Sequence, residues 1–368
     1  MDFEKIELAP TADFHVHLRD GEMMRMVVPT IRLGGVDTVY VMPNLIPPVT
    51  TVEAAKSYLA RIQPLAPDVK FLMTLYMTES LTPEIIDDAA SAGITGVKVY
   101  PAGVTTNSQS GVVDYESFFP IFEAMQRNDM VLNLHGEAPS TPSGNFIASE
   151  KAGESAVSVL NAEKLFLPTL HKIHNAFPKL RIVLEHCTTR DALDAVLKCG
   201  PSVAATITAH HLWICVDDVC GDAFNFCKPV AKTMEDRVAL VRAAVEGGNG
   251  KFFFGSDSAP HPVTAKTGVK KAAAGCFTQS CATQLVIGAI EEAVAKGWIS
   301  REVTAASLED FLSNRGRKFY KLPEHAHGRK IQLERKGAKV PDVLKNATGD
   351  IEVIPFRRGE DTWKLTWK

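Results

Sequence analysis

A chain of 368 residues with 45% hydrophobic and 23% charged residues has the composition of a globular protein with a large core. Its net charge of −3 excludes the basic surface that nucleic-acid binding requires, and no apolar run reaches the roughly 18 residues of a membrane-spanning helix. The charged start MDFEKIELAP predicts no signal peptide. The seven cysteines have no CxxC spacing, so we expect reduced thiols in a cytoplasmic protein rather than a disulfide framework.

Short apolar runs alternate with longer segments of helical periodicity along most of the chain. We predict strands at residues 12–18, 37–43, 70–77, 95–101, 130–136, 181–187, 202–208 and 251–257. We predict helices at residues 22–33, 52–63, 83–92, 115–128, 154–177, 189–199, 234–246 and 278–296, with another near 303–313.

Eight successive strand-then-helix units predict a closed (β/α)₈ barrel over about residues 12–320, within a single domain of residues 1–368. An open, doubly wound sheet is the alternative. It usually has fewer strands, and no GxGxxG turn follows the first strand here. The C-terminal extension, about residues 321–368, is predicted to add one or two peripheral strands.

Polar side chains occupy the C-terminal ends of the predicted strands, where (β/α)₈ enzymes place their catalytic groups. The first strand reads DFHVHLRD, and its His15 and His17 can share one face because they are two residues apart. Later strand ends carry Asn44, Lys98, His135, His186 and Asp257, and His261 follows four residues after the last. A closed barrel would bring these residues to one mouth. Imidazole and carboxylate suit zinc and related ions, so we predict a metal site there.

A single histidine at a strand end is more often a core or rim residue than a metal ligand. Four such histidines, with an aspartate and an inward lysine, are hard to explain in that way. No functional role is predicted for the other histidines: His171 and His174 on a helix, His210 and His211 after the seventh strand, and His325 and His327 in a segment without a strand.

Lys98 lies in the strand GVKVYP and would be a repelled, poorly solvated cation beside a metal site. Three arrangements would relieve this repulsion: Lys98 faces outward to the helix layer, it pairs with a nearby carboxylate, or its amine is chemically modified. A neutral amine can add carbon dioxide and become a carbamate, an anion whose two oxygens can bridge two metal ions. Two ions held in this way would strongly lower the pKa of a shared water.

Seven motifs together resemble the amidohydrolase superfamily and, more narrowly, the short, single-domain dihydroorotases of pyrimidine biosynthesis. They are DFHVHLRD, VMPN, GVKVYPAGVTTNS, LNLHGE, LEHCTT, GSDSAPH and AGCF, spread from Asp13 to about Phe277. The HxH pair indicates the superfamily, whereas Arg19, Asn44 and His261, with the TTNS loop, indicate the narrower group. The segment HHLWICVDDVCGDAFNF departs most from the bacterial forms and is closer to the fungal ones.

The resemblance implies a binuclear centre that holds two divalent ions, most simply Zn²⁺, although cobalt or manganese also suits these ligands. It assigns His15, His17 and Asp257 to the more buried ion, His135 and His186 to the second, and a carbamylated Lys98 to the bridge. It assigns substrate contacts to Arg19, Asn44, His261 and His135, and to backbone groups of Lys228 and Ala274. The loop from Pro101 to Gly111, with Thr105 and Thr106, is predicted to be either a lid that binds substrate or an ordinary long loop.

The implied reaction is the reversible interconversion of N-carbamoyl-L-aspartate and L-dihydroorotate, with Asp257 as the acid–base group, in a protein that forms a homodimer. A hydantoinase or allantoinase is one alternative, but those enzymes build a β-sandwich partly from residues before the barrel, and only about 11 residues precede it here. A non-catalytic scaffold is the other alternative. All six residues expected to bind metal are present, which argues against a scaffold.

Overall fold

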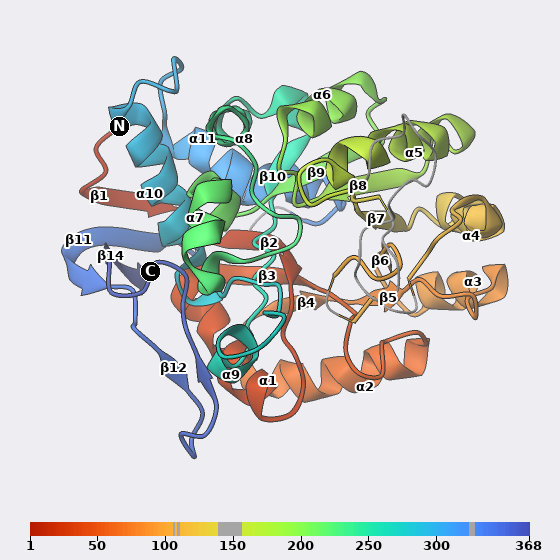
Figure 1. Cartoon of the computed structure of the whole chain (residues 1–368), viewed down its shortest axis with the longest axis horizontal. Helices are drawn as coiled ribbons and strands as arrows, with labels where there is room; N and C mark the ends of the chain where they lie inside the picture. Colours follow the sequence, from red (N-terminus) through yellow and green to blue (C-terminus); the bar gives the residue numbers. More distant parts are fainter. Residues whose placement is uncertain (106, 109–110, 139–156, 324–327) are drawn as a thin grey trace.

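The computed structural model describes residues 1–105, 107–108, 111–138, 157–323 and 328–368. In this part of the chain, parallel strands form the predicted (β/α)₈ barrel, with helices around it (Figure 1). The strands are β2 (Thr11–Val16), β3 (Val36–Val41), β4 (Lys70–Leu72) continued by β5 (Thr74–Tyr76), β6 (Gly96–Val99), β7 (Val131–His135), β8 (Arg181–Glu185), β9 (Val203–Ile207) and β10 (Phe252–Phe254). The barrel closes where the segment after β10 meets β2: the His17 backbone N–H donates to the Ser258 carbonyl at 2.9 Å.

Each predicted strand runs one or more residues past the C-terminal end of the observed strand, and two predicted strands differ further. The predicted strand 70–77 is interrupted at Met73, which separates β4 from β5. The predicted strand 251–257 is paired only over Phe252–Phe254, so Asp257 lies beyond the strand on the loop that follows it. That residues 1–368 form a single domain stays a prediction.

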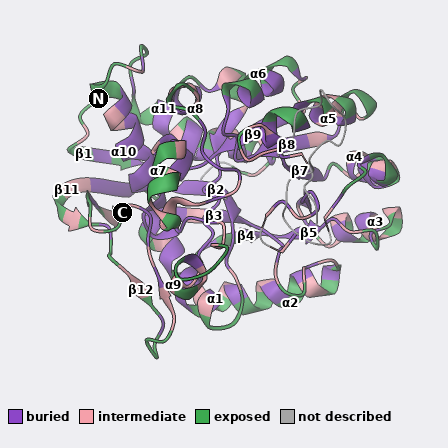
Figure 2. Cartoon of the chain, viewed as in Figure 1, coloured by how far each residue is buried: buried purple, intermediate pink, exposed green. Residues whose placement is uncertain are grey.

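The surrounding helices are α1 (Gly21–Val27), α2 (Val52–Ile62), α3 (Pro83–Ser91), α4 (Phe119–Arg127), α5 (Ala162–Ala176), α6 (Arg190–Lys198), α8 (Met234–Glu246) and α10 (Ala282–Ala295). Four of them begin after a threonine whose side chain accepts a hydrogen bond from the first turn: Thr51, Thr82, Thr189 and Thr233. Figure 2 shows these helices exposed on their outer faces and the barrel strands buried. Among the described residues, no helix is long and apolar enough to cross a membrane.

Proline and local irregularity divide some of the predicted helices. The predicted helix 22–33 is divided into α1 and the 3-10 helix η1 (Val28–Gly34), because Pro29 has no backbone N–H with which to continue the α-helical pattern. The predicted helix 278–296 begins with a 3-10 turn, η7 (Gln279–Cys281), before α10.

Two further predicted helices have different boundaries. The predicted helix 154–177 starts only at Ala162; residues 157–161 are not helical, and 154–156 lie outside the described residues. The helix predicted near 303–313 consists of α11 (Ala305–Glu309), the π-helix η8 (Asp310–Asn314) and α12 (Arg315–Phe319). The short helices α7 (Val216–Gly221) and α9 (Val263–Lys266), in loops after β9 and β10, were not predicted.

The prediction of one or two strands in the C-terminal extension was wrong. The extension contains β11 (Ile331–Lys339), β12 (Leu344–Lys345), β13 (Glu352–Val353) and β14 (Asp361–Trp367). The unpredicted strand β1 (Lys5–Leu8) pairs antiparallel with β11, which pairs with β14. The two-residue strands β12 and β13 are too short to leave an alternating pattern.

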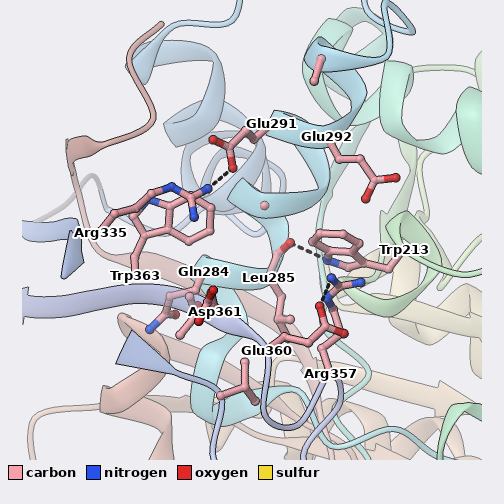
Figure 3. A pocket seen from close by; sticks show the side chains of 14 residues that line it. Trp213, Gln284, Leu285, Glu291, Glu292, Arg335, Arg357, Glu360, Asp361 and Trp363 are labelled. Carbon is pink, nitrogen blue, oxygen red and sulfur yellow. Dashed lines mark hydrogen bonds and ion pairs between the residues drawn. The ribbon is translucent and has the colours of Figure 1, made fainter. Parts of the chain in front are cut away.

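The C-terminal extension packs on α10 around a hollow of about 370 Å³ (Figure 3). The Arg335 guanidinium lies 4.1 Å from the Trp363 ring centroid and forms an ion pair with Glu291 of α10. Across the hollow, the Arg357 guanidinium lies 3.4 Å from the centroid of the Trp213 ring. Cation–π contacts and ion pairs therefore attach the extension to the barrel.

Aromatic side chains close the N-terminal end of the barrel. The Tyr320 ring stacks on Phe14 with centroids 4.7 Å apart, and Phe253 packs edge-on against Phe14 at 5.3 Å. Above these rings, the Asn133 side-chain amide donates to the Tyr320 hydroxyl at 2.8 Å and to Glu185 Oε1 at 2.6 Å. This packed floor supports the polar groups at the opposite mouth of the barrel.

We predict that Tyr320→Ala lowers the free energy of unfolding by about 3–5 kcal/mol, because the floor of the barrel would be left with a cavity. Tyr320→Phe is the matched control. It keeps the ring and loses one hydrogen bond, so it should cost about 1–2 kcal/mol. Urea unfolding followed by fluorescence measures both values, and equal losses in the two variants would contradict the packing role.

Candidate metal centre

The two histidines of the first barrel strand reach the interior because β2 contains a β-bulge. Phe14 packs in the barrel core, so strict alternation would turn His15 and His17 outward. Between Asp13 and Val16, however, β2 has one residue more than the paired segment of β3. His15 lies within this bulge and His17 follows it, and their ring centroids are 5.3 Å apart at the pocket.

His15, His17 and Asp257 converge on one point, with their ligand atoms all within 4.8 Å of one another. Asp257 Oδ1 lies 3.3 Å from His15 Nε2 and 3.0 Å from His17 Nε2. The other ring nitrogens have partners: His15 Nδ1 lies 2.8 Å from Glu185 Oε2, and His17 Nδ1 lies 2.7 Å from Asn44 Oδ1. Outer partners of this kind orient metal-binding imidazoles, so this geometry suits a divalent ion.

His135 and His186 lie beside this group. Their ring centroids are 4.6 Å apart, and the His186 ring is 5.1 Å from His15. His135 Nε2 lies 2.7 Å from Glu137 Oε2, which leaves Nδ1 as its possible ligand atom. His186 Nδ1 is buried without a hydrogen-bond partner in the described chain. The second group of imidazoles therefore also has nitrogen atoms suited to a metal ion.

Lys98 is fully buried at the same mouth of the barrel. Its Nζ has no hydrogen-bond partner among the described residues and lies 5.1 Å from the Tyr100 ring centroid. Burial lowers the pKa of Lys98 to about 8, although Glu185 and Asp257 favour the charged form. Besides burial, the charge of Lys98 lowers the pKa values of His15, His135 and His186, so this amine lies near both groups of imidazoles.

The site holds its ligands in the protonation states that bind metal. Burial raises the pKa of Asp257, but His15 and His17 lower it by a larger amount. The resulting pKa of Asp257 lies well below the ordinary value. Burial lowers the pKa values of His15 and His17, so both imidazoles are neutral at neutral pH. An ionised carboxylate and neutral imidazoles are the metal-binding forms.

Three site residues have left-handed backbone conformations, with φ of 63° at Arg19, 43° at His186 and 46° at Asp257. Such conformations are uncommon for residues other than glycine and cost of order 1–3 kcal/mol each. Each residue follows the end of a strand, where the backbone turns across the barrel mouth. The surrounding fold therefore maintains a strained arrangement of these side chains.

The pocket above the histidines contains most of the residues that were predicted from the sequence. It is lined by His15, His17, Arg19, Asn44, Tyr100, Thr105, His135, His186, Lys228, Asp257, Ala259 and Ala274. Lys98 is fully buried and does not line the pocket, and His261 adjoins Arg19. Thr106 lies outside the described residues.

Arg19 brings a positive charge to this pocket, and no described carboxylate pairs with it. Its Nε donates to the Pro260 carbonyl at 2.8 Å, and its Nη2 lies 3.1 Å from His261 Nε2. Burial, reinforced by Arg19, lowers the pKa of His261 to about 2, so the imidazole is neutral. Because Arg19 forms no ion pair among the described residues, the pocket attracts an anionic group.

The loop after β6 contacts the site through Asn107. The Asn107 side-chain amide donates to the Asn44 carbonyl at 3.0 Å, and the Tyr76 hydroxyl donates to the Asn107 carbonyl at 3.2 Å. Thr105 lines the pocket beside them. The lid function of this loop stays a prediction.

Sequence reasoning missed Glu185, Glu137, Tyr100 and Ala259. Glu185 precedes His186 in the motif LEH, and Glu137 lies two residues after His135 in the motif LHGE, so both could have been found beside predicted ligands. Of the histidines without a predicted role, His171 contacts a cysteine and His174 Nε2 accepts from the Gly200 N–H at 2.9 Å. His325 and His327 lie outside the described residues.

A comparison with protein-family models returned no match. Among curated proteins, the dihydroorotase of Saccharomyces cerevisiae is 44% identical over 379 aligned residues, which cover 99% of both chains. A probable dihydroorotase of Schizosaccharomyces pombe is 45% identical over 364 residues, again covering 99% of both chains.

Solved structures show the same relationship. The crystal structure of the S. cerevisiae dihydroorotase in complex with 5-fluoroorotic acid has a TM-score of 0.89, 44% identity and 99% coverage of both chains. A dihydroorotase from Campylobacter jejuni has a TM-score of 0.81 and 32% identity, covering 100% of this chain and 98% of its own. An L-hydantoinase from Arthrobacter aurescens shares the fold, with a TM-score of 0.75. It is 18% identical, and the match covers 97% of this chain and 85% of the hydantoinase chain. Because relatives 44–45% identical match nearly the whole chain, it belongs to the dihydroorotases of the amidohydrolase superfamily.

Proposed function

We propose that this chain catalyses the reversible interconversion of N-carbamoyl-L-aspartate and L-dihydroorotate. The observation that supports this reaction most directly is the half-buried Arg19, which has no ion-pair partner among the described residues and lies in the same pocket as the cluster of metal-binding side chains. Both substrates carry a carboxylate that the reaction leaves unchanged. Hydantoin, allantoin and dihydrouracil carry no such carboxylate, so they would leave the guanidinium without a counter-charge.

We assign two divalent ions, most simply Zn²⁺, to the metal-binding residues of this pocket. The dihydroorotase family is metal-dependent, and the neutral imidazoles, the ionised Asp257 and the unpartnered Lys98 fit such ions. His15, His17 and Asp257 would hold one ion, His135 and His186 the other, and a carbamate on Lys98 would link them. When bound, the ions would polarise the amide carbonyl and lower the pKa of an attacking water.

Asp257 is the residue we assign to proton transfer. Its carboxylate is ionised at neutral pH and lies at the centre of the cluster, 3.0 Å from His17 Nε2. In the hydrolytic direction it would take a proton from the attacking water and deliver it to the departing ring nitrogen. In the biosynthetic direction the same proton would move from nitrogen to the leaving water.

Arg19 and His261 would orient the substrate by its carboxylate. The planar guanidinium can donate two parallel hydrogen bonds, and the neutral His261 beside it adds no competing charge. Asn44, Thr105, Lys228 and Ala274 line the same pocket and would contact the rest of the substrate. Two further expectations belong to this proposal: the homodimer that the resemblance implies, and the cytoplasmic location that the scattered cysteines predict.

A spectrophotometric assay with four cyclic substrates tests the proposed reaction. The purified chain should hydrolyse L-dihydroorotate faster than dihydrouracil, hydantoin or allantoin, because only the first supplies a carboxylate to Arg19. Faster turnover of any of the other three would overturn the assignment of substrate.

Arg19→Met extends this test to the pocket. A charge-assisted hydrogen bond contributes about 1.5–3 kcal/mol, so kcat/KM for L-dihydroorotate should fall by about 10- to 150-fold. Metal content should not change, because Arg19 is outside the ligand set. The exposed Arg61→Met is the matched control and should keep normal kinetics. Loss of metal from Arg19→Met would show that its role is misassigned.

Asp257→Asn should reduce kcat by at least about 10²–10⁴, because the amide cannot carry the proton. Asp257→Ala should also lose metal, since it removes a ligand. Metal content and steady-state rates of the two variants separate the two roles. Near-normal kcat in the asparagine variant would exclude Asp257 as the acid–base group.

Intact-mass measurement under native, neutral conditions should show the added mass of one carbon dioxide, and acid should remove it. Lys98→Ala should lose this adduct, most of the metal and the activity. A small carboxylate such as acetate should restore part of the activity by occupying the vacated space. Lys266→Arg, at another buried lysine, should keep the adduct. An unmodified Lys98 in a fully active, metal-loaded enzyme would refute the carbamate.

A further inference from the structure

A second cluster of potential metal ligands lies near the pocket but does not line it. It consists of His210, Cys227 and Cys276, whose ligand atoms all lie within 4.8 Å of one another. All three side chains are buried, with at most 1% of their surface exposed. Three segments that are distant in sequence supply them. The cluster is therefore a product of the tertiary fold.

His210 is the residue of this cluster whose polar atoms lack partners. It begins η4 (His210–Leu212) after β9, and neither of its ring nitrogens has a hydrogen-bond partner among the described residues. Leaving a buried polar group unsatisfied typically costs about 1–3 kcal/mol. The adjacent His211, by contrast, has its nitrogens 2.9 Å from Thr208 Oγ1 and 3.0 Å from the Pro229 carbonyl.

We propose that His210, Cys227 and Cys276 bind a Zn²⁺ ion separate from those of the catalytic pocket. Two thiolates and an imidazole are a ligand set that zinc favours. The adjacent His211 stays outside this ligand set, because its Nε2 donates to the Pro229 carbonyl at 3.0 Å. This cluster has sulfur ligands, whereas the pocket has only nitrogen and oxygen ligands.

Charge balance suits the buried position of this ion. Without metal, a hydrogen bond with Cys276 and burial hold the pKa of Cys227 well above its ordinary value, so the Cys227 thiol stays protonated. Binding of Zn²⁺ releases both thiol protons and forms two zinc–sulfur bonds. The two thiolates then neutralise the double positive charge, and no net charge is left in the protein interior.

The ion would join two segments that form walls of the substrate pocket. Cys227 directly precedes Lys228, and Cys276 lies two residues after Ala274. The two segments already touch, because the Gly275 N–H donates to the Phe226 carbonyl at 2.9 Å. A metal crosslink to η4 would fix both walls relative to the barrel.

The C-terminal extension covers this cluster. The Phe356 ring centroid lies 6.3 Å from that of His210, and the Phe356 N–H donates to the Phe277 carbonyl at 2.8 Å. The position is therefore shielded from solvent on the side of the extension. A buried metal crosslink here would join the barrel loops beneath the extension.

Cobalt(II) loading of metal-free enzyme tests the proposal without reference to activity. A Cys220→Ser background removes the exposed cysteine. This protein should show near-ultraviolet sulfur-to-cobalt charge-transfer absorption, which the pocket's ligands cannot produce. Further Cys227→Ser or Cys276→Ser substitution should abolish the band and reduce bound cobalt by one ion per chain. Cys281→Ser, at a buried cysteine outside the cluster, should keep both. Absence of the band in cobalt-saturated protein would overturn the proposal.

A second measurement uses the unmutated enzyme, in case the serine variants do not fold. A thiol-specific mercurial added to zinc-loaded protein should release one zinc ion per chain, detected with a metal indicator dye. The ions held by imidazole and carboxylate should remain bound. No zinc release would refute the site. Free thiols should also be counted in the denatured protein, where all seven cysteines should react. A count of five would refute the site, because Cys227 and Cys276 would then form a disulfide.

Discussion

The carboxylate of Glu185 connects the packed floor of the barrel to the metal-binding histidines. It lies 2.6 Å from the Asn133 amide, 2.6 Å from Thr206 Oγ1 and 2.8 Å from His15 Nδ1. Burial raises the pKa of this group, whereas Lys98 and the hydrogen bonds favour its ionised form. A buried carboxylate is stable only when its oxygens are paired, so the floor, Glu185 and His15 have to be positioned together.

The barrel and the position of its site followed from the sequence because both depend on local patterns. Strand-to-helix alternation predicted the fold, and polar residues at strand ends predicted which side chains would meet. The bulge in β2 was not predictable, since it depends on pairing with β3. Glu185 was missed because one charge at the end of an apolar strand does not reveal three partners from other strands.

Electrostatics separate the two ends of the pocket into different tasks. The lower end combines neutral imidazoles with an ionised Asp257, which favours cations. The upper end presents Arg19 beside a neutral His261, which favours an anion. A substrate with a carboxylate at one end and a polarisable amide at the other matches this gradient. The single pocket can thus fix the direction in which such a substrate enters.

The sheet formed by β1, β11 and β14 has a consequence for synthesis of the chain. Its first strand, Lys5–Leu8, leaves the ribosome long before its partners at Ile331–Lys339 and Asp361–Trp367. Tyr320, which closes the barrel floor, is also made late. The nascent protein therefore exposes an unpaired strand edge and an open barrel floor through most of translation, and pairing of such distant segments is slow. The N-terminal strand and the barrel floor can therefore reach their final arrangement only after the last residues of the chain have been made.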